Sequence, residues 1–142
     1  MIIIVEGPDL AGKTTLINQL NIKGEYDVVH FDAPDDDFDY KADYLNVLDK
    51  ENVILDRYFF SEIVYSKVFE RQCRLSAETM EKIKEKLKNK PHTLIYINPG
   101  IETLKRRYRE RGDELITESQ IEKIVKEYEN LFFGGIKNVN KN

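Results

Sequence analysis

Residues 1–15 read MIIIVEGPDLAGKTT, and this stretch decides the fold. Residues 2–5 are apolar and β-branched, which is typical of a strand buried on both faces of a parallel sheet. Residues 7–14 then match the pattern G-x-x-x-x-G-K-[ST] in full. The residues that follow, to about Leu20, are compatible with a helix. A buried strand, a glycine loop and a helix in this order predict a loop that binds phosphate.

Each residue type in the loop has a physical role in holding phosphate. Two glycines let the backbone turn so that its amide groups point inward at an anion, beside the positive end of the following helix. The lysine is predicted to reach the outer phosphates, and the threonine hydroxyl after it to coordinate Mg²⁺. ATP and Mg²⁺ are therefore the predicted cofactors. The predicted nucleotide-binding residues are Gly7, Pro8, Asp9, Leu10, Ala11, Gly12, Lys13, Thr14 and Thr15.

The rest of the chain alternates strand and helix patterns. Apolar strand candidates lie at 27–31, 52–56 and 93–97. Helices are predicted at 40–50, 60–74, 76–89, 101–111 and 117–132, with Ser76 as the cap of the third and Thr117 and Gln120 as a capping box for the last. This alternation predicts an α/β fold, with a four- to five-stranded parallel sheet between two layers of helices. A fifth strand would lie at 136–139. With 142 residues, the chain is expected to form a single domain over 1–142, with a short lid region at 105–118.

Composition excludes several other classes of protein. No apolar run is longer than residues 1–5, so no membrane span is expected. A single cysteine, Cys73, excludes an internal disulfide framework and is consistent with a cytoplasmic setting. The chain lacks an N-K-x-D string, the guanine-reading signature of GTPases, and is too short for a helicase domain. These features disfavour GTPases and helicases, and a match wider than the loop is needed to choose among the other phosphate-loop proteins.

Three segments in the right order resemble the thymidylate kinases. Residues 6–15 read EGPDLAGKTT, residues 56–58 read DRY after a buried strand, and Arg107 and Arg111 lie on a helix after the fourth strand. The resemblance implies a P-loop kinase with ATP as donor and a deoxynucleotide or deoxynucleoside as acceptor. It implies that Asp9 contacts the acceptor sugar and that Arg57 holds the acceptor phosphate. It further implies that Arg107 and Arg111 approach the transferred phosphoryl group.

The pattern departs from that family on the acceptor side. Residues 16–56 contain no arginine, and residues 25–56 carry eleven acids against two lysines. A hydroxyl acceptor needs a carboxylate to take its proton rather than a cradle of cations. Asp32, at the end of the second strand, is the predicted base for such an acceptor. Asp56 is predicted to hold Mg²⁺ together with Thr14, or to orient Arg57.

Three functional hypotheses remain open from the sequence. The first is a thymidylate kinase-like enzyme that phosphorylates a nucleoside monophosphate. The second is a kinase of a hydroxyl group, on a free deoxynucleoside or on a modified base in DNA. The third is a module that binds nucleotide without catalysis. The predicted partner is a small nucleotide or nucleoside acceptor; a nucleic-acid acceptor and a homodimer are alternatives, and a membrane partner is not expected.

Overall fold

The computed structural model describes residues 1–31, 40–112 and 116–134. Its centre is a parallel sheet of four strands, β1 (Ile2–Glu6), β2 (Asp27–His30), β3 (Val53–Asp56) and β4 (His92–Tyr96), in the order β2-β3-β1-β4. Val5 pairs with Asp56 in β3 and with Ile95 in β4. This confirms the predicted α/β class. The fifth strand predicted at 136–139 lies outside the described residues.

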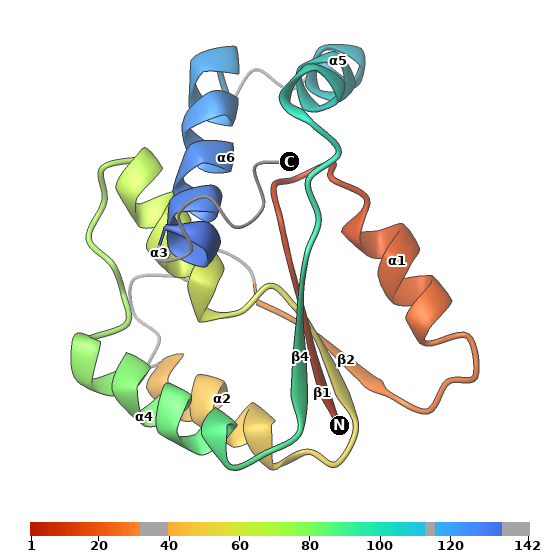
Figure 1. Cartoon of the computed structure of the whole chain (residues 1–142), viewed down its shortest axis with the longest axis vertical. Helices are drawn as coiled ribbons and strands as arrows, with labels where there is room; N and C mark the ends of the chain where they lie inside the picture. Colours follow the sequence, from red (N-terminus) through yellow and green to blue (C-terminus); the bar gives the residue numbers. More distant parts are fainter. Residues whose placement is uncertain (32–39, 113–115, 135–142) are drawn as a thin grey trace.

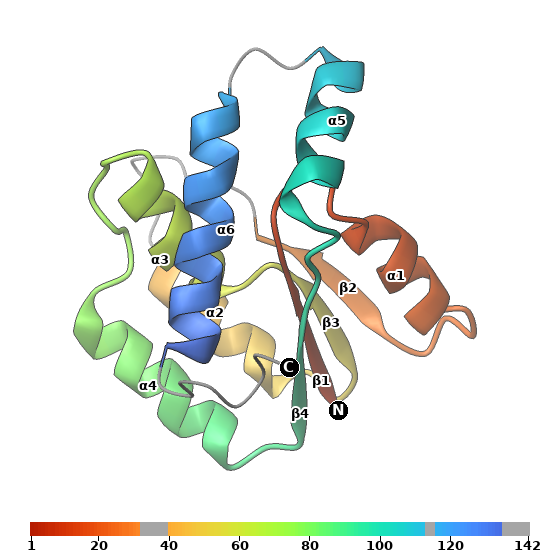
Figure 2. The same ribbon diagram turned by 45° about the horizontal axis from the view of Figure 1, so that its top comes forward.

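The side chains of β1 alternate between two apolar layers. Ile2 and Ile4 pack with residues of β3 and of the helices on one face of the sheet. Ile3 and Val5 pack on the opposite face, where α1 (Lys13–Leu20) contributes Ile17. Figures 1 and 2 show α1 on one side of the sheet. On the other side lie α2 (Tyr40–Asn46), α3 (Phe59–Val68), α4 (Ala77–Lys88) and α6 (Glu118–Phe133). This burial on both faces explains the unbroken apolar sequence of the strand.

The helices end close to the predicted positions, with one exception. The structure has α2 (Tyr40–Asn46), continued by a 3₁₀ turn (Val47–Asp49), α4 (Ala77–Lys88), α5 (Ile101–Arg111) and α6 (Glu118–Phe133). The prediction for α3 was too long, because this helix spans Phe59–Val68 and stops short of Arg74. Glu70 adopts a left-handed backbone with φ 52°. The carboxylate of Glu62 then accepts the Arg74 amide at 2.9 Å, which turns the chain back against the helix.

The predicted caps of α4 and α6 are confirmed. The Ser76 hydroxyl accepts the Thr79 amide, and Thr117 and Gln120 form a reciprocal capping box. α5 packs against α6 through Leu104, Tyr108, Ile121 and Val125, and Ala11 of the phosphate loop joins this cluster. α6 therefore holds α5 over the loop. No helix in the described ranges is long and apolar enough to span a membrane.

Candidate nucleotide site

The phosphate loop lies at the carboxyl end of β1, as predicted. Gly7 has φ 151°, and a Cβ there would lie 2.5 Å from the carbonyl oxygen of Ile97, so only glycine fits. Gly12 has φ 104° and precedes the first residue of α1. The Nζ of Lys13 donates to the carbonyl oxygens of Gly7 and Pro8, each at 2.8 Å. The lysine therefore lies inside the loop, with its ammonium group where an anion would bind.

The loop opens into a cavity of about 800 Å³ that is lined mainly by polar groups. Residues from the loop, the carboxyl end of β3 and α5 meet in it. They are Asp9, Leu10, Gly12, Lys13, Thr14, Thr15, Asp56, Arg57, Arg107, Glu110 and Arg111. We call this the phosphate cavity. It brings together ten of the site residues proposed from the sequence, and four of the eleven lining residues carry a positive charge.

The basic residues of α5 divide between two directions. Lys105 and Arg109 pair with Glu122 and Glu118 at the α6 side. Arg107 donates to the carbonyl oxygen of Leu10 at 2.7 Å, which joins α5 to the phosphate loop. Together with Arg111, it lines the phosphate cavity. The spacing i, i+4 of these two arginines explains why they share one face of the helix.

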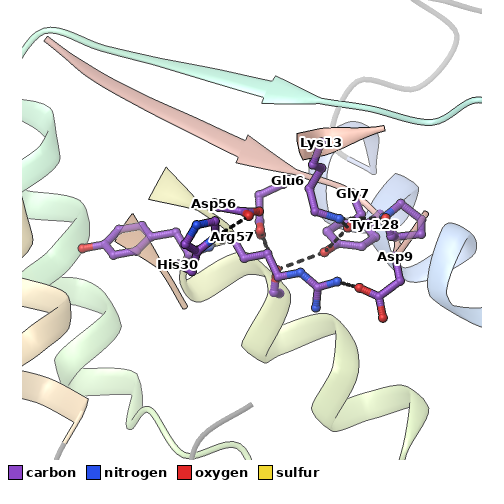
Figure 3. Close-up of polar contacts among 11 residues, drawn as sticks. Glu6, Gly7, Asp9, Lys13, His30, Asp56, Arg57 and Tyr128 are labelled. Carbon is purple, nitrogen blue, oxygen red and sulfur yellow. Dashed lines mark hydrogen bonds and ion pairs between the residues drawn. The ribbon is translucent and has the colours of Figure 1, made fainter. Parts of the chain in front are cut away.

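Arg57 has an unusual backbone and a central position. Its φ is 68°, a left-handed conformation that a residue with a Cβ rarely adopts. Its guanidinium forms an ion pair with Asp9 of the loop (Figure 3). The same group lies 5.1 Å from the ring centre of Tyr65, on α3. Arg57 thus bridges the phosphate loop and an aromatic wall.

That wall belongs to a second, smaller cavity of about 130 Å³. Its lining residues are Phe31, Tyr44, Arg57, Ser61, Glu62, Tyr65, Phe69 and Arg71, and we call it the aromatic cavity. The buried carboxylate of Glu62 accepts a fork of two hydrogen bonds from Arg71, at 2.6 and 2.9 Å. Tyr65 lines this cavity, whereas its neighbours along the chain Tyr58 and Phe59 are buried in the core.

Asp56 ends β3 beside the last residue of β2, and the structure gives it a partner that sequence reasoning missed. The Nδ1 of His30 lies 2.6 Å from the Asp56 carboxylate. The His30 side chain is 61% exposed, and Figure 3 shows it directed at Asp56, at the rim of the site. No local pattern in the sequence pairs the two residues, because they meet only at the ends of adjacent strands of the sheet.

Glu6 is the second functional candidate that the sequence reasoning missed. It is completely buried, and its carboxylate accepts the Tyr58 amide at 3.1 Å and the Ser61 hydroxyl at 2.5 and 3.0 Å. The Ser61 hydroxyl lies 3.1 Å from the hydroxyl of Tyr128 on α6. Burial raises the pKa of Glu6 to about 7, against the opposing effects of its hydrogen bonds and of the nearby Arg57 and Lys13.

We expect Glu6 to make the fold less stable as the pH rises toward neutrality. The carboxyl of Glu6 keeps its proton up to about pH 7 in the folded protein, whereas its ordinary pKa is 4.5. Its contribution to the free energy of unfolding is therefore fully present below pH 4.5 and is lost by pH 7. The loss amounts to about 3 kcal/mol, since each pKa unit corresponds to roughly 1.4 kcal/mol. Urea denaturation between pH 4.5 and 8 gives the free energy of unfolding of wild type and of Glu6→Gln. The difference between these two free energies should change by this amount over the pH range. A pH-independent difference would contradict the expectation.

Comparison with known proteins places the chain in a family. Protein YorR, derived from the SPbeta prophage of Bacillus subtilis (strain 168), is 31% identical over 131 residues, which cover 89% of this chain and 79% of YorR. The chain belongs to the YorR family. No family model matches the sequence. A crystal structure of YorR in complex with phosphorylated GDP has a TM-score of 0.82 and 28% identity, over 94% of this chain and 80% of that one.

A more distant likeness concerns the fold alone. Deoxyadenosine kinase from M. mycoides, solved with bound dATP, has a TM-score of 0.60 and 21% identity, over 96% of this chain and 86% of that chain. The member of the YorR family described here therefore has the P-loop kinase fold that the sequence predicts. A thymidylate acceptor stays a prediction. Asp32, the predicted base, and residues 113–115 of the predicted lid lie outside the described residues.

Proposed function

We propose that this protein is a P-loop kinase that transfers the γ-phosphate of a nucleoside triphosphate, such as ATP, to a hydroxyl group of a nucleoside. One observation carries the proposal: Arg57 lines both the phosphate cavity and the aromatic cavity. A phosphotransferase needs two adjoining sites with a cation where they meet, because negative charge spreads over the transferred group in the transition state.

The donor is assigned to the phosphate cavity. Lys13 would exchange the carbonyl oxygens of Gly7 and Pro8 for phosphate oxygens, and Arg107 and Arg111 would approach the triphosphate from the lid, proposed at 105–118. YorR was solved with phosphorylated GDP. Membership of its family supports a guanine nucleotide as an additional ligand to test. The proposed nucleotide-binding residues are those of the loop, from Gly7 to Thr15.

The oxygen ligands in the phosphate cavity fit Mg²⁺. The Thr14 hydroxyl and the Asp56 carboxylate line the cavity together, and Mg²⁺ usually takes one or two protein oxygens, with phosphates and water completing its shell. Within the described ranges, no group of three or more His, Cys, Asp or Glu side chains is arranged to hold a metal ion. We therefore propose Thr14 and Asp56 as its protein contacts. When bound, Mg²⁺ would neutralise charge on the phosphates.

A hydroxyl acceptor is supported by the charges around the aromatic cavity. Both of its cations already have carboxylate partners, since Arg71 is bound by Glu62 and Arg57 by Asp9. A neutral nucleoside requires no further cation, and its base would lie against Tyr65. In the reaction, the hydroxyl oxygen bonds to the γ-phosphorus, the bond to the bridging oxygen breaks, and the diphosphate leaves. The hydroxyl proton passes to a carboxylate, for which we propose Asp32.

A second candidate function is the thymidylate kinase-like transfer to a nucleoside monophosphate. The observation that favours it is the presence of two arginines, Arg57 and Arg71, at one small cavity. An acceptor phosphate would replace the carboxylates of Asp9 and Glu62 as their partners. Because Glu62 is buried and bound by two nitrogens of Arg71, this exchange would leave a buried carboxylate without its cation.

A matched acceptor screen tests the proposal. Diphosphate formation is followed with ATP or GTP as donor, with and without Mg²⁺, against the four deoxynucleosides and their monophosphates. We expect turnover that requires Mg²⁺ with at least one deoxynucleoside, and none with the monophosphates. Turnover with monophosphates alone would support the second candidate. Tight triphosphate binding without turnover on any acceptor would contradict both and support a non-catalytic module.

A further inference from the structure

The carboxylate of Glu6 faces charged or polar groups from every element packed around it. Arg57 and Tyr58 follow β3, Ser61 and Tyr65 lie on α3, Lys13 begins α1 and Tyr128 lies on α6. Glu6 lines neither cavity. It is therefore placed to act on the site through its neighbours rather than on a substrate.

Glu6 and its neighbour on β1 hold the turn at Arg57 from both sides. The Arg57 amide donates to the carbonyl oxygen of Val5 at 2.9 Å, and the next amide, of Tyr58, donates to the Glu6 carboxylate at 3.1 Å. Between these two bonds, the backbone of Arg57 has its left-handed φ of 68°. A residue with a Cβ keeps this conformation only where its surroundings impose it. The carboxylate supplies one of the two bonds that impose it.

The Ser61 hydroxyl joins the carboxylate to α3, and Tyr128 joins Ser61 to the phosphate loop. The Ser61 hydroxyl donates to both carboxylate oxygens, and the Tyr128 hydroxyl, next to Ser61, lies 3.4 Å from the carbonyl oxygen of Gly7. Figure 3 shows Glu6 behind Arg57, with Tyr128 between it and the loop. The phosphate loop, α3 and α6 thus meet at one buried acid. An apolar residue at position 6 would pack in the core but could not hold the Tyr58 amide.

We propose that Glu6 is a positioning residue, whose carboxylate holds the left-handed turn at Arg57 and thereby directs the guanidinium to the junction of the two cavities. This inference rests on the proposed phosphoryl transfer. The ionised carboxylate is the stronger acceptor for the Tyr58 amide and the better counter-charge for Arg57, so its protonation loosens the turn. Burial, which raises the pKa of Glu6 to about 7, puts this change within the working pH range.

The test compares kcat for wild type and Glu6→Gln from pH 5.5 to 8.5. We expect the ratio of wild type to variant to be near one below pH 6 and to rise to about tenfold above pH 8, with the KM for ATP unchanged. In an Arg57→Ala background the ratio should stay near one throughout. A ratio that does not vary with pH, or that is equally large without Arg57, would overturn the proposal.

A second readout does not depend on turnover. In the NMR spectrum of wild type, the Nε–H resonance of Arg57 should shift with a midpoint near pH 7, and in Glu6→Gln it should not. If this shift is seen but no acceptor is phosphorylated, the proposed function fails and the positioning role stands. If transfer occurs and the resonance does not respond, the positioning role fails alone. Glu6→Met, which also lacks a titratable group, replaces Glu6→Gln if the latter does not fold.

Discussion

Replacement of Arg57 by alanine is expected to lower the rate of phosphoryl transfer by about 10³-fold or more, a loss typical of arginines that stabilise a transferred phosphoryl group. The guanidinium lies between the two cavities, so it can contact the group in transit from donor to acceptor. It is mostly enclosed, with 18% of its side chain exposed, which strengthens its electrostatic effect relative to a surface charge. Initial rates at saturating donor and acceptor measure the loss.

Two further variants make the Arg57 result specific. Arg57→Lys keeps a positive charge but loses the planar fork, so we expect an intermediate rate. Arg109→Ala removes an arginine that pairs with Glu118 and lines neither cavity, and we expect it to stay within about twofold of wild type. Thermal denaturation checks that each variant folds. A loss below about tenfold in folded Arg57→Ala would reduce Arg57 to a structural partner of Asp9.

The sequence was sufficient for the parts of the site that depend on contiguous residues. A phosphate loop such as 7–14 has a fixed spacing because its own backbone surrounds the phosphate. It can therefore be recognised from a short run of consecutive residues. Arg57 was predictable because the carboxyl end of a buried strand is where ligands bind in parallel sheets. Helical spacing predicted that Arg107 and Arg111 lie on the same face of their helix. These predictions concern residues whose role follows from the element that carries them.

The rest depends on contacts between segments that are distant in the sequence. Glu6 interacts with Tyr58 and Ser61, more than fifty residues away, and no local pattern shows that an acid at the end of an apolar strand turns inward. His30 meets Asp56 only because β2 and β3 are neighbours in the sheet. The fork between Arg71 and Glu62 could not be foreseen either, because it requires α3 to end at Val68 rather than at Arg74.

Replacement of Lys13 by alanine is expected to abolish transfer and to weaken binding of a nucleoside triphosphate by at least about tenfold. Lys13 is buried, with 8% of the residue exposed, and its ammonium group donates to the carbonyl oxygens of Gly7 and Pro8. Burial lowers the pKa of Lys13, and the negative charges of Asp56 and Glu6 oppose that effect. A triphosphate would add negative charge at the same place, which favours the protonated lysine and thus its own binding.

The loss of affinity caused by Lys13→Ala should depend on the number of phosphates in the ligand. Calorimetric titration with ATP, ADP and adenosine is expected to show a large loss for ATP, a smaller one for ADP and no change for adenosine. Lys88→Ala, at an exposed lysine of α4, is the matched control and should bind all three ligands as wild type does. Equal losses for all three ligands would indicate a collapsed loop rather than a missing cation. Unchanged turnover in a folded Lys13→Ala would contradict the assignment of the loop itself, because no other lysine lines the phosphate cavity within the described residues.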